Sequence, residues 1–294
     1  MQCRNRCLAE FLTSVLFLVF SAAPLAASPV WRLSDADGRV DYIAATMHLL
    51  QADDYPLPQG FNQAYREATE LVFETDLYAM QDDEFARRLQ QQGFYPAGTT
   101  LQQVLDEPSY ALLADYARRQ GMDMAAVAGM KVGLLLANIS LHELQQRGLS
   151  STGVDLHFLK RALVDKKAVY SLESLEQQID YVVNMGQGYE SELVSQSLAE
   201  LAQLDEQLET LRTAWRSGDL ETLDRLLNRE LKEKYPPLYR RLLLHRNAEW
   251  LPLLRSQLAR PGVSLVLVGA AHLPGEDGLL RQLQAAGWHI EQLP

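Results

Sequence analysis

Cysteine is almost absent from this sequence. Its two cysteines, Cys3 and Cys7, both lie within the first 27 residues. The rest of the chain therefore has no means of forming a disulfide, a cysteine nucleophile or a cysteine-ligated zinc site. Any chemistry there has to come from histidine, carboxylate and other nitrogen or oxygen side chains.

Long hydrophobic runs are also scarce. Residues 11–20 (FLTSVLFLVF) are apolar, with Arg4 and Arg6 before them and the small residues of SAAPLAAS after them. This is the order of a secretory signal peptide, which we predict for residues 1–27 with cleavage near Ala27. An uncleaved membrane anchor is the alternative, but a spanning helix needs about 20 apolar residues.

No later segment is long enough to cross a membrane. The longest candidate, Val132–Ile139, is short and continues into a polar helix. No linker rich in Gly, Ser or Pro divides the chain, so we expect residues 28–294 to form a single domain. The prediction is a periplasmic or secreted protein without stable membrane insertion once the signal peptide is removed.

Positive charge is in short supply. The chain has 27 Lys and Arg against 38 Asp and Glu, a net charge of −11, which argues against nucleic-acid partners and anionic membrane surfaces. No P-loop, GxGxxG or GxSxG motif occurs, and His142-Glu143 lacks the second histidine of HExxH. His157 and His245 lie on helical segments, where surface or packing roles are expected.

The apolar pattern predicts an α/β fold, rich in helix around a small mixed sheet. Short β-branched and aromatic runs predict strands at 40–47, 71–75, 168–172, 264–268 and 288–293. Helical spacing predicts helices at 61–69, 82–92, 101–120, 130–147, 174–185, 190–217, 220–233, 238–258 and 279–286. The long runs of helix between the strands form a large, mostly helical insert.

The two ends of the chain resemble each other. Residues 40–75 and residues 264–293 both read as strand, two residues, His-Leu, loop, helix and strand. This pattern suggests two related halves of the kind strand–GxxH–helix–strand. Coincidence between two ordinary βαβ units is the alternative.

Four ionisable residues lie at or just after the carboxyl ends of predicted strands. They are His48, Glu74, Glu173 and His272. If their strands are parallel, these side chains lie on one edge of the sheet, where open α/β sheets bind their ligands. Taken singly, each is more often a structural histidine, a helix cap or a solvated carboxylate.

Together, these residue types are the ligands of a hydrolytic metal site. Two histidines and a carboxylate leave an open position for water, so His48, Glu74 and His272 are the predicted metal ligands. Glu173 is predicted as general base or further ligand. Arg246 is predicted to orient a carboxylate or to stabilise an oxyanion, the alternative being an ordinary surface salt bridge.

At these residues the sequence resembles the TraB/GumN family, which includes the Tiki proteins. The matching segments are YIAATMHLL, ELVFETD, GVDLHFLKRALVDKKAVYSLESLEQQ, HRNAEWLPLL and SLVLVGAAHLPGEDGLLRQLQAAGW, which together extend over most of the chain after residue 40. One position departs from the pattern, since Ala45 stands where the first GxxH block has glycine. The histidine of that block is kept as His48.

The resemblance implies an α/β fold with two related halves, similar to erythromycin esterase-like and ChaN-like proteins. It also implies a metal-dependent hydrolase, because Tiki members are described as metalloproteases that use the GxxH histidines. We therefore expect an exported hydrolase that uses a divalent ion (Mn, Co or Zn) on a peptide or small-molecule substrate. The alternative is a non-catalytic periplasmic protein that sequesters a peptide or haem.

Overall fold

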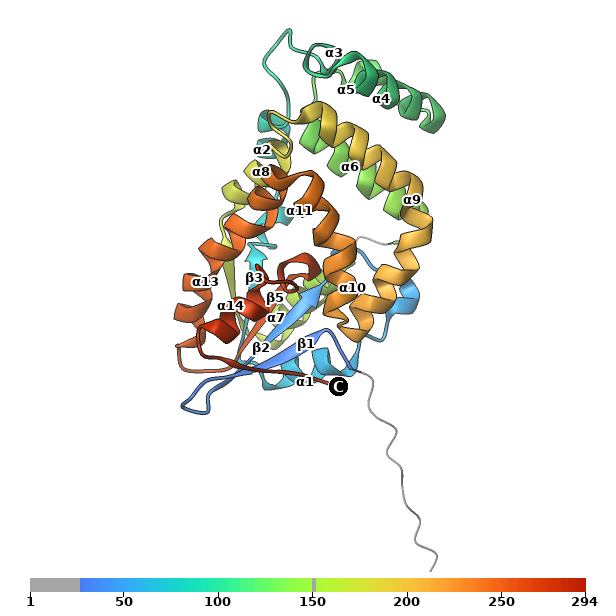
Figure 1. Cartoon of the computed structure of the whole chain (residues 1–294). Helices are drawn as coiled ribbons and strands as arrows, with labels where there is room; N and C mark the ends of the chain where they lie inside the picture. Colours follow the sequence, from blue (N-terminus) through green and yellow to red (C-terminus); the bar gives the residue numbers. More distant parts are fainter. Residues whose placement is uncertain (1–26, 150–151) are drawn as a thin grey trace, which may run out of the picture.

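The computed structural model describes residues 27–149 and 152–294. The predicted signal peptide lies outside these residues apart from Ala27, and so do both cysteines. The described chain is an α/β protein with a six-stranded sheet at one end and a largely helical part at the other (Figure 1). The predicted fold class is confirmed at this level.

The sheet has the strand order β4-β3-β5-β2-β1-β6. Neighbours among β2, β3, β4 and β5 pair in parallel, whereas β1 is antiparallel to both β2 and β6. The bounds are β1 Val30–Ser34, β2 Val40–Thr46, β3 Glu70–Thr75, β4 Ala168–Glu173, β5 Ser264–Gly269 and β6 His289–Gln292. The five predicted strands are present. β1 was not predicted.

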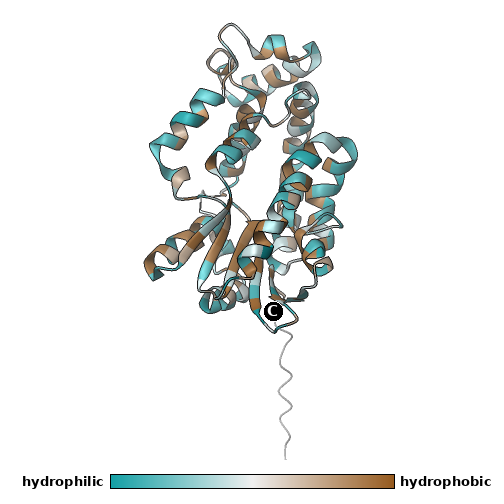
Figure 2. Ribbon diagram, turned by 90° about the vertical axis from the view of Figure 1, so that its left-hand side faces the viewer, coloured by the Kyte–Doolittle hydropathy of each residue, from teal (hydrophilic) through white to brown (hydrophobic). Residues whose placement is uncertain are grey.

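Two pairs of helices cover the sheet. α1 (Gln59–Glu67) and α7 (Val154–Asp165) lie on one face, where Phe61 and Phe158 stack with ring centres 5.7 Å apart. α13 (His245–Leu258) and α14 (Leu279–Ala285) pack together on the other face. This division follows from the right-handed crossovers that join parallel strands. Figure 2 shows apolar strands between helices whose outer surfaces are polar.

The remaining helices form the helical part, with its own apolar cluster around Leu113, Leu135 and Val194. They are α2 Asp83–Gln92, α3 Leu101–Val104, α4 Glu107–Gln120, α5 Met124–Val127, α6 Val132–Gln146, α8 Leu175–Val183, α9 Glu190–Ser217, α10 Leu220–Asp224, α11 Glu230–Lys234 and α12 Pro236–Tyr239. Two π-helical turns, η3 (Arg225–Arg229) and η4 (Arg240–Leu244), adjoin them. Within the described ranges, no helix is both long and apolar enough to cross a membrane.

One predicted helix is broken. Residues 101–120 were predicted as a single helix, but the chain is extended at Leu105 and Asp106 between α3 and α4. The Asp106 side chain accepts a hydrogen bond from the Ser109 amide, and Pro108 lies in the first turn of α4. An Asp cap followed by an early proline starts a new helix.

The two predicted halves have the same order of elements but different surroundings. β2, His48, α1 and β3 follow one another at the start, and β5, His272, α14 and β6 at the end. However, β3 pairs with β5 inside the sheet, whereas β6 lies at the far edge beside β1. A relationship between the halves, or with ChaN-like proteins, stays a prediction.

Candidate functional site

The parallel strands bring the predicted site residues to one edge of the sheet. Glu74 lies in β3 and Glu173 ends β4, while His48 and His272 follow β2 and β5. In Figure 1 the arrowheads of β2 and β3 point toward the helical part. The site therefore lies at the end of the sheet that faces the helical part, and α7, α8 and α13 supply its remaining contacts.

Arg246 of α13 joins the two carboxylates. Its Nε and Nη2 donate to Glu173 Oε1 and Oε2 at 2.6 and 3.0 Å, and Nη2 also donates to Glu74 Oε2 at 2.7 Å. The guanidinium lies 4.7 Å from the Trp250 ring centre and 4.9 Å from that of Tyr181. Two carboxylates and two aromatic rings therefore fix the planar guanidinium of Arg246 in a single orientation.

The two carboxylates have opposite pKa shifts. Burial raises the pKa of Glu173 even though Arg246 opposes the shift, and Trp250 Nε1 donates to its Oε1 at 2.9 Å. Burial also disfavours ionisation of Glu74, but the positive charge of Arg246 opposes this effect and the pKa of Glu74 is held at about 2. The Gly269 amide donates to Glu74 Oε1 at 2.5 Å. Glu74 is therefore the carboxylate of this pair that stays ionised most readily.

His272 is buried and neutral. Burial lowers its pKa to about 3. Its Nδ1 is 2.7 Å from Asn247 Oδ1, and the Asn247 amide donates to the carbonyls of His272 and Asp277, which identifies Oδ1 as the acceptor. His272 Nδ1 therefore carries the proton. Its Nε2 keeps the lone pair and accepts from Arg246 Nη1 at 3.2 Å.

His48 is held in the same way by a different residue. Its side chain is 68 % exposed, and its Nδ1 donates to Asp155 Oδ2 at 2.8 Å from the first turn of α7. The Asp155 carboxylate raises the pKa of His48 to about 9. With Nδ1 bound to Asp155, Nε2 is the ring nitrogen that a metal ion would take, and at neutral pH it would release its proton when the ion binds.

The three predicted metal ligands face a single small residue, Gly269. A Cβ there would lie 3.0 Å from Glu74 Oε1, 3.7 Å from His272 Cδ2 and 4.0 Å from His48 Nε2. Imidazole and carboxylate donors around a glycine fit a divalent ion in donor type, and the Nδ1 contacts of both histidines leave Nε2 as the nitrogen that would ligate it. In the part of the chain described, no three His, Cys, Asp or Glu side chains already close around one point as ligands.

Two buried hydroxyls lie at the same edge. Thr46 pairs in register with Gly269, and Thr75 pairs with Glu173. Neither hydroxyl oxygen has a hydrogen-bond partner among the described residues. Because buried polar groups normally have a hydrogen-bond partner, these two hydroxyls favour binding of a polar ligand at this edge of the sheet.

The comparison with known protein families shows to which family the chain belongs. The profile of the TraB/PrgY/gumN family matches residues 29–292. The chain belongs to the TraB/PrgY/gumN family. Its resemblance to that family is thereby confirmed over nearly the whole described chain. No significant match was found among curated proteins or among solved structures.

Five contacts of this TraB/PrgY/gumN site were missing from the sequence prediction: Asp155, Tyr181, Asn247, Trp250 and Gly269. Asn247 and Trp250 lie on the same helix as Arg246, so helical spacing from Arg246 was the available signal. The sequence signal for Asp155 was weaker, since an acidic residue in the first turn of a helix is common. His157 is outside the site and packs against Tyr55 and Phe158.

Proposed function

We propose that the protein is an exported metal-dependent hydrolase that acts on peptides. His48, Glu74 and His272 would hold the ion. The observation that carries the proposal is the matched orientation of the two histidines. Each has Nδ1 bound to a side-chain oxygen, of Asp155 or Asn247, as histidine ligands of metals almost always do. Export rests on the leader pattern, and the peptide substrate on the family resemblance.

The chain's own groups have separate roles in this proposal. A divalent ion (Mn, Co or Zn) bound there would supply Lewis acidity and lower the pKa of water. Glu74 is ionised and contributes the negative ligand. Arg246 orients both carboxylates, and its positive charge favours negative charge that develops on a substrate oxygen bound beside it. Glu173 has both oxygens hydrogen bonded to Arg246, which favours a positioning role, and its raised pKa suits proton transfer.

Metal binding is the first test. Purified protein should bind Mn, Co or Zn in a calorimetric titration, and His48→Ala and His272→Ala should each abolish binding. Asp155→Asn should weaken it by about 10–100-fold, as loss of the carboxylate partner of a histidine ligand does. Gly269→Ala should weaken it too, because the new methyl group would lie 3.0 Å from Glu74 Oε1.

The control is Gly129→Ala, whose methyl group would meet nothing nearer than Phe94 Cδ1 at 3.8 Å. It should bind metal as the unchanged protein does. The proposal is wrong if the protein binds none of the three ions and no added ion produces cleavage of a peptide library. Equal affinity in His48→Ala and the unchanged protein would also overturn it.

A second function, binding without turnover, is favoured by one observation. Arg246 occupies oxygens of both Glu74 and Glu173, so each carboxylate has a cationic partner without an ion. A protein that sequesters a peptide or haem would bind it equally with and without a chelator. Haem titration followed by absorbance, and peptide binding in the presence of EDTA, separate this function from the first.

A further inference from the structure

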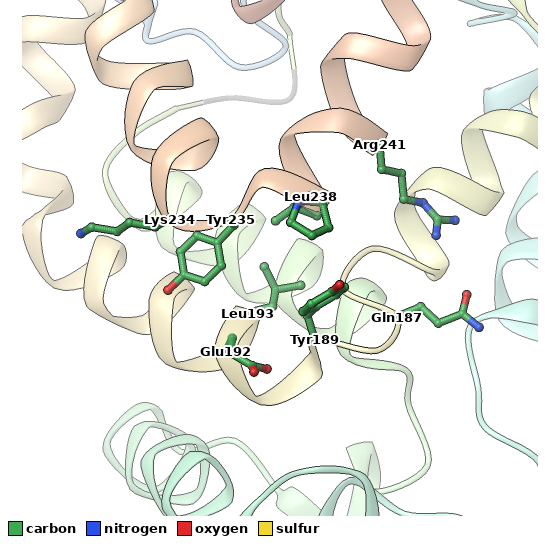
Figure 3. A pocket seen from close by; sticks show the side chains of 10 residues that line it. Gln187, Tyr189, Glu192, Leu193, Lys234, Tyr235, Leu238 and Arg241 are labelled. Atoms are coloured by element: carbon green, nitrogen blue, oxygen red, sulfur yellow. The ribbon is translucent and has the colours of Figure 1, made fainter.

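A cavity of about 410 Å³ lies between α9 and the segment that leads into α13, and Arg241, which lines it, precedes Arg246 of the site by one turn of helix. Figure 3 shows its central side chains, in which rings and aliphatic groups from two segments face one another. Tyr189 and Leu193 come from the start of α9, and Tyr235, Pro237 and Leu238 come from the end of α11 and from α12. Its size is within the range of ligand pockets, which are about 300–1,000 Å³.

The two basic residues at the mouth of this cavity are already paired. Arg241 donates to Asp180 Oδ2 at 2.8 Å, and Lys234 forms an ion pair with Glu230. In Figure 3 Arg241 and Lys234 extend away from the apolar centre. Glu192 has no hydrogen-bond or ion-pair partner within residues 27–149 and 152–294, so an acidic ligand would meet an unbalanced negative charge. The cavity is suited to an uncharged apolar group.

A π-helical turn joins the cavity to the site. In an α-helix, Arg241 and Arg246 would point about 140° apart, since 3.6 residues make a turn. The wider turn of η4 reduces this angle, and both arginines face α8, where Arg241 contacts Asp180 and Arg246 lies over Tyr181. Arg246 Nη1 also donates to the Leu242 carbonyl in η4 at 3.4 Å. Such turns occur frequently at functional sites.

We propose that this cavity is the subsite for a large, uncharged apolar side chain of a peptide substrate. The inference rests on the proposed function, because the neighbouring Arg246 site is where the peptide would be cleaved. A peptide residue with a leucine, phenylalanine or tyrosine side chain would bury it among Tyr189, Leu193 and Leu238. Acidic residues at that position would be disfavoured by Glu192.

The test is direct binding, without turnover. The probes are pentapeptides of the form acetyl-Ala-Ala-X-Ala-Ala-amide, in which X is Phe, Leu, Ala or Asp, titrated calorimetrically into metal-free protein. The peptides with Phe and Leu should bind at least tenfold more tightly than those with Ala and Asp. Leu238→Trp, which fills the cavity, should remove this preference, whereas Leu253→Trp, at a 48 % exposed position on α13, should keep it.

Tyr189→Ala is the second variant, in case Leu238→Trp does not fold. Tyr189 is 48 % exposed, so its loss should leave the fold intact while weakening binding of the Phe peptide several-fold. Equal affinity for all four peptides, or an unchanged preference in these variants, would overturn the inference. Because the titrations use metal-free protein, failure of the metal site and failure of the cavity would be distinguished.

Discussion

At the scale of single residues, Arg246 is the centre of the site. It is 7 % exposed and lies between two carboxylates that are themselves buried. Removing one member of such a network leaves the others charged and without a partner, which costs more than the network contributed. The arginine is thus needed for the fold as well as for any chemistry.

Arg246→Met should lower the free energy of unfolding by about 3–5 kcal/mol, because Glu74 and Glu173 would remain buried without their cation. Urea denaturation followed by circular dichroism measures this. The control is Arg241→Met, which breaks a partly exposed pair with Asp180 and should change stability by less than about 1 kcal/mol. Similar losses in the two variants would contradict the role given to Arg246.

Asp41 is a buried acid whose ionisation opposes folding. It is 2 % exposed and accepts the Ser264 amide at 2.7 Å, and burial raises its pKa to about 6. The pKa of Asp41 is higher in the folded than in the unfolded chain, so its protonated form favours folding. This contribution to the free energy of unfolding is fully present below the ordinary pKa of 3.8 and is lost as the pH rises through about 6.

Asp41→Asn keeps an acceptor for the Ser264 amide and removes the charge. At pH 8 it should therefore raise the free energy of unfolding by up to about 3 kcal/mol, a difference that should vanish near pH 4. Thermal unfolding of both proteins at a series of pH values measures the difference. A gap that does not depend on pH would show that Asp41 is not protonated in the fold.

At the scale of elements, the start of α7 fixes the loop that carries His48. Gly153 precedes α7, and a Cβ there would lie 2.3 Å from the His48 carbonyl carbon and oxygen and 2.4 Å from the Met47 carbonyl oxygen. The Val154 amide also donates to the Met47 carbonyl at 3.0 Å. The helix that supplies Asp155 is thus in direct contact with the backbone of the histidine it orients.

Gly153→Ala should therefore displace His48 and destabilise the protein by about 1–3 kcal/mol, since backbone atoms have to move. Unfolding measurements give the stability, and the NMR shift of the His48 ring gives the displacement. Gly129→Ala has room for its methyl group and should change neither. An undisturbed His48 in Gly153→Ala would contradict this account of the loop.

The sequence predicted elements better than it predicted contacts. The apolar runs of β2, β3, β4 and β5 have a period and length that depend on local residues, so these strands and the residues after them could be located. β1 was missed although the Asp37-Gly38 pair before β2 is a hairpin signal, and Gly38 has a φ of +79°. Asp155 is 107 residues from His48, and only the folded chain brings them together.

At the scale of the whole molecule, two apolar clusters differ in size. The larger one surrounds the sheet, and the smaller one lies among α3, α4, α6 and the start of α9. α9 joins them, with Val194 in the smaller cluster and Trp215 in the larger, where Trp215 Nε1 donates to the Ala45 carbonyl at 2.9 Å. Each cluster stabilises the elements whose apolar side chains it buries, because the stabilisation is proportional to the apolar area that those side chains remove from water.

Backbone amides of α4 and α6 should therefore exchange with solvent faster than those of β2 and β5, through partial unfolding of the smaller cluster. Hydrogen exchange followed by mass spectrometry compares the two sets. Leu113→Ala should accelerate exchange in α4 and α6 and leave β5 unchanged, since Leu113 belongs to the smaller cluster. Equal acceleration in the strands would show a single cooperative unit.

The position of β5 has a consequence for how the protein is made. β5 lies between β3 and β2, although it is the fifth strand in the chain. A ribosome that has delivered β2, β3 and β4 has therefore made His48, Glu74 and Glu173 but not the strand that holds β2 and β3 together. The candidate site cannot assemble until residue 272 has emerged, so a chain that is cut short before β5 holds its first three site residues without the strand that brings them together.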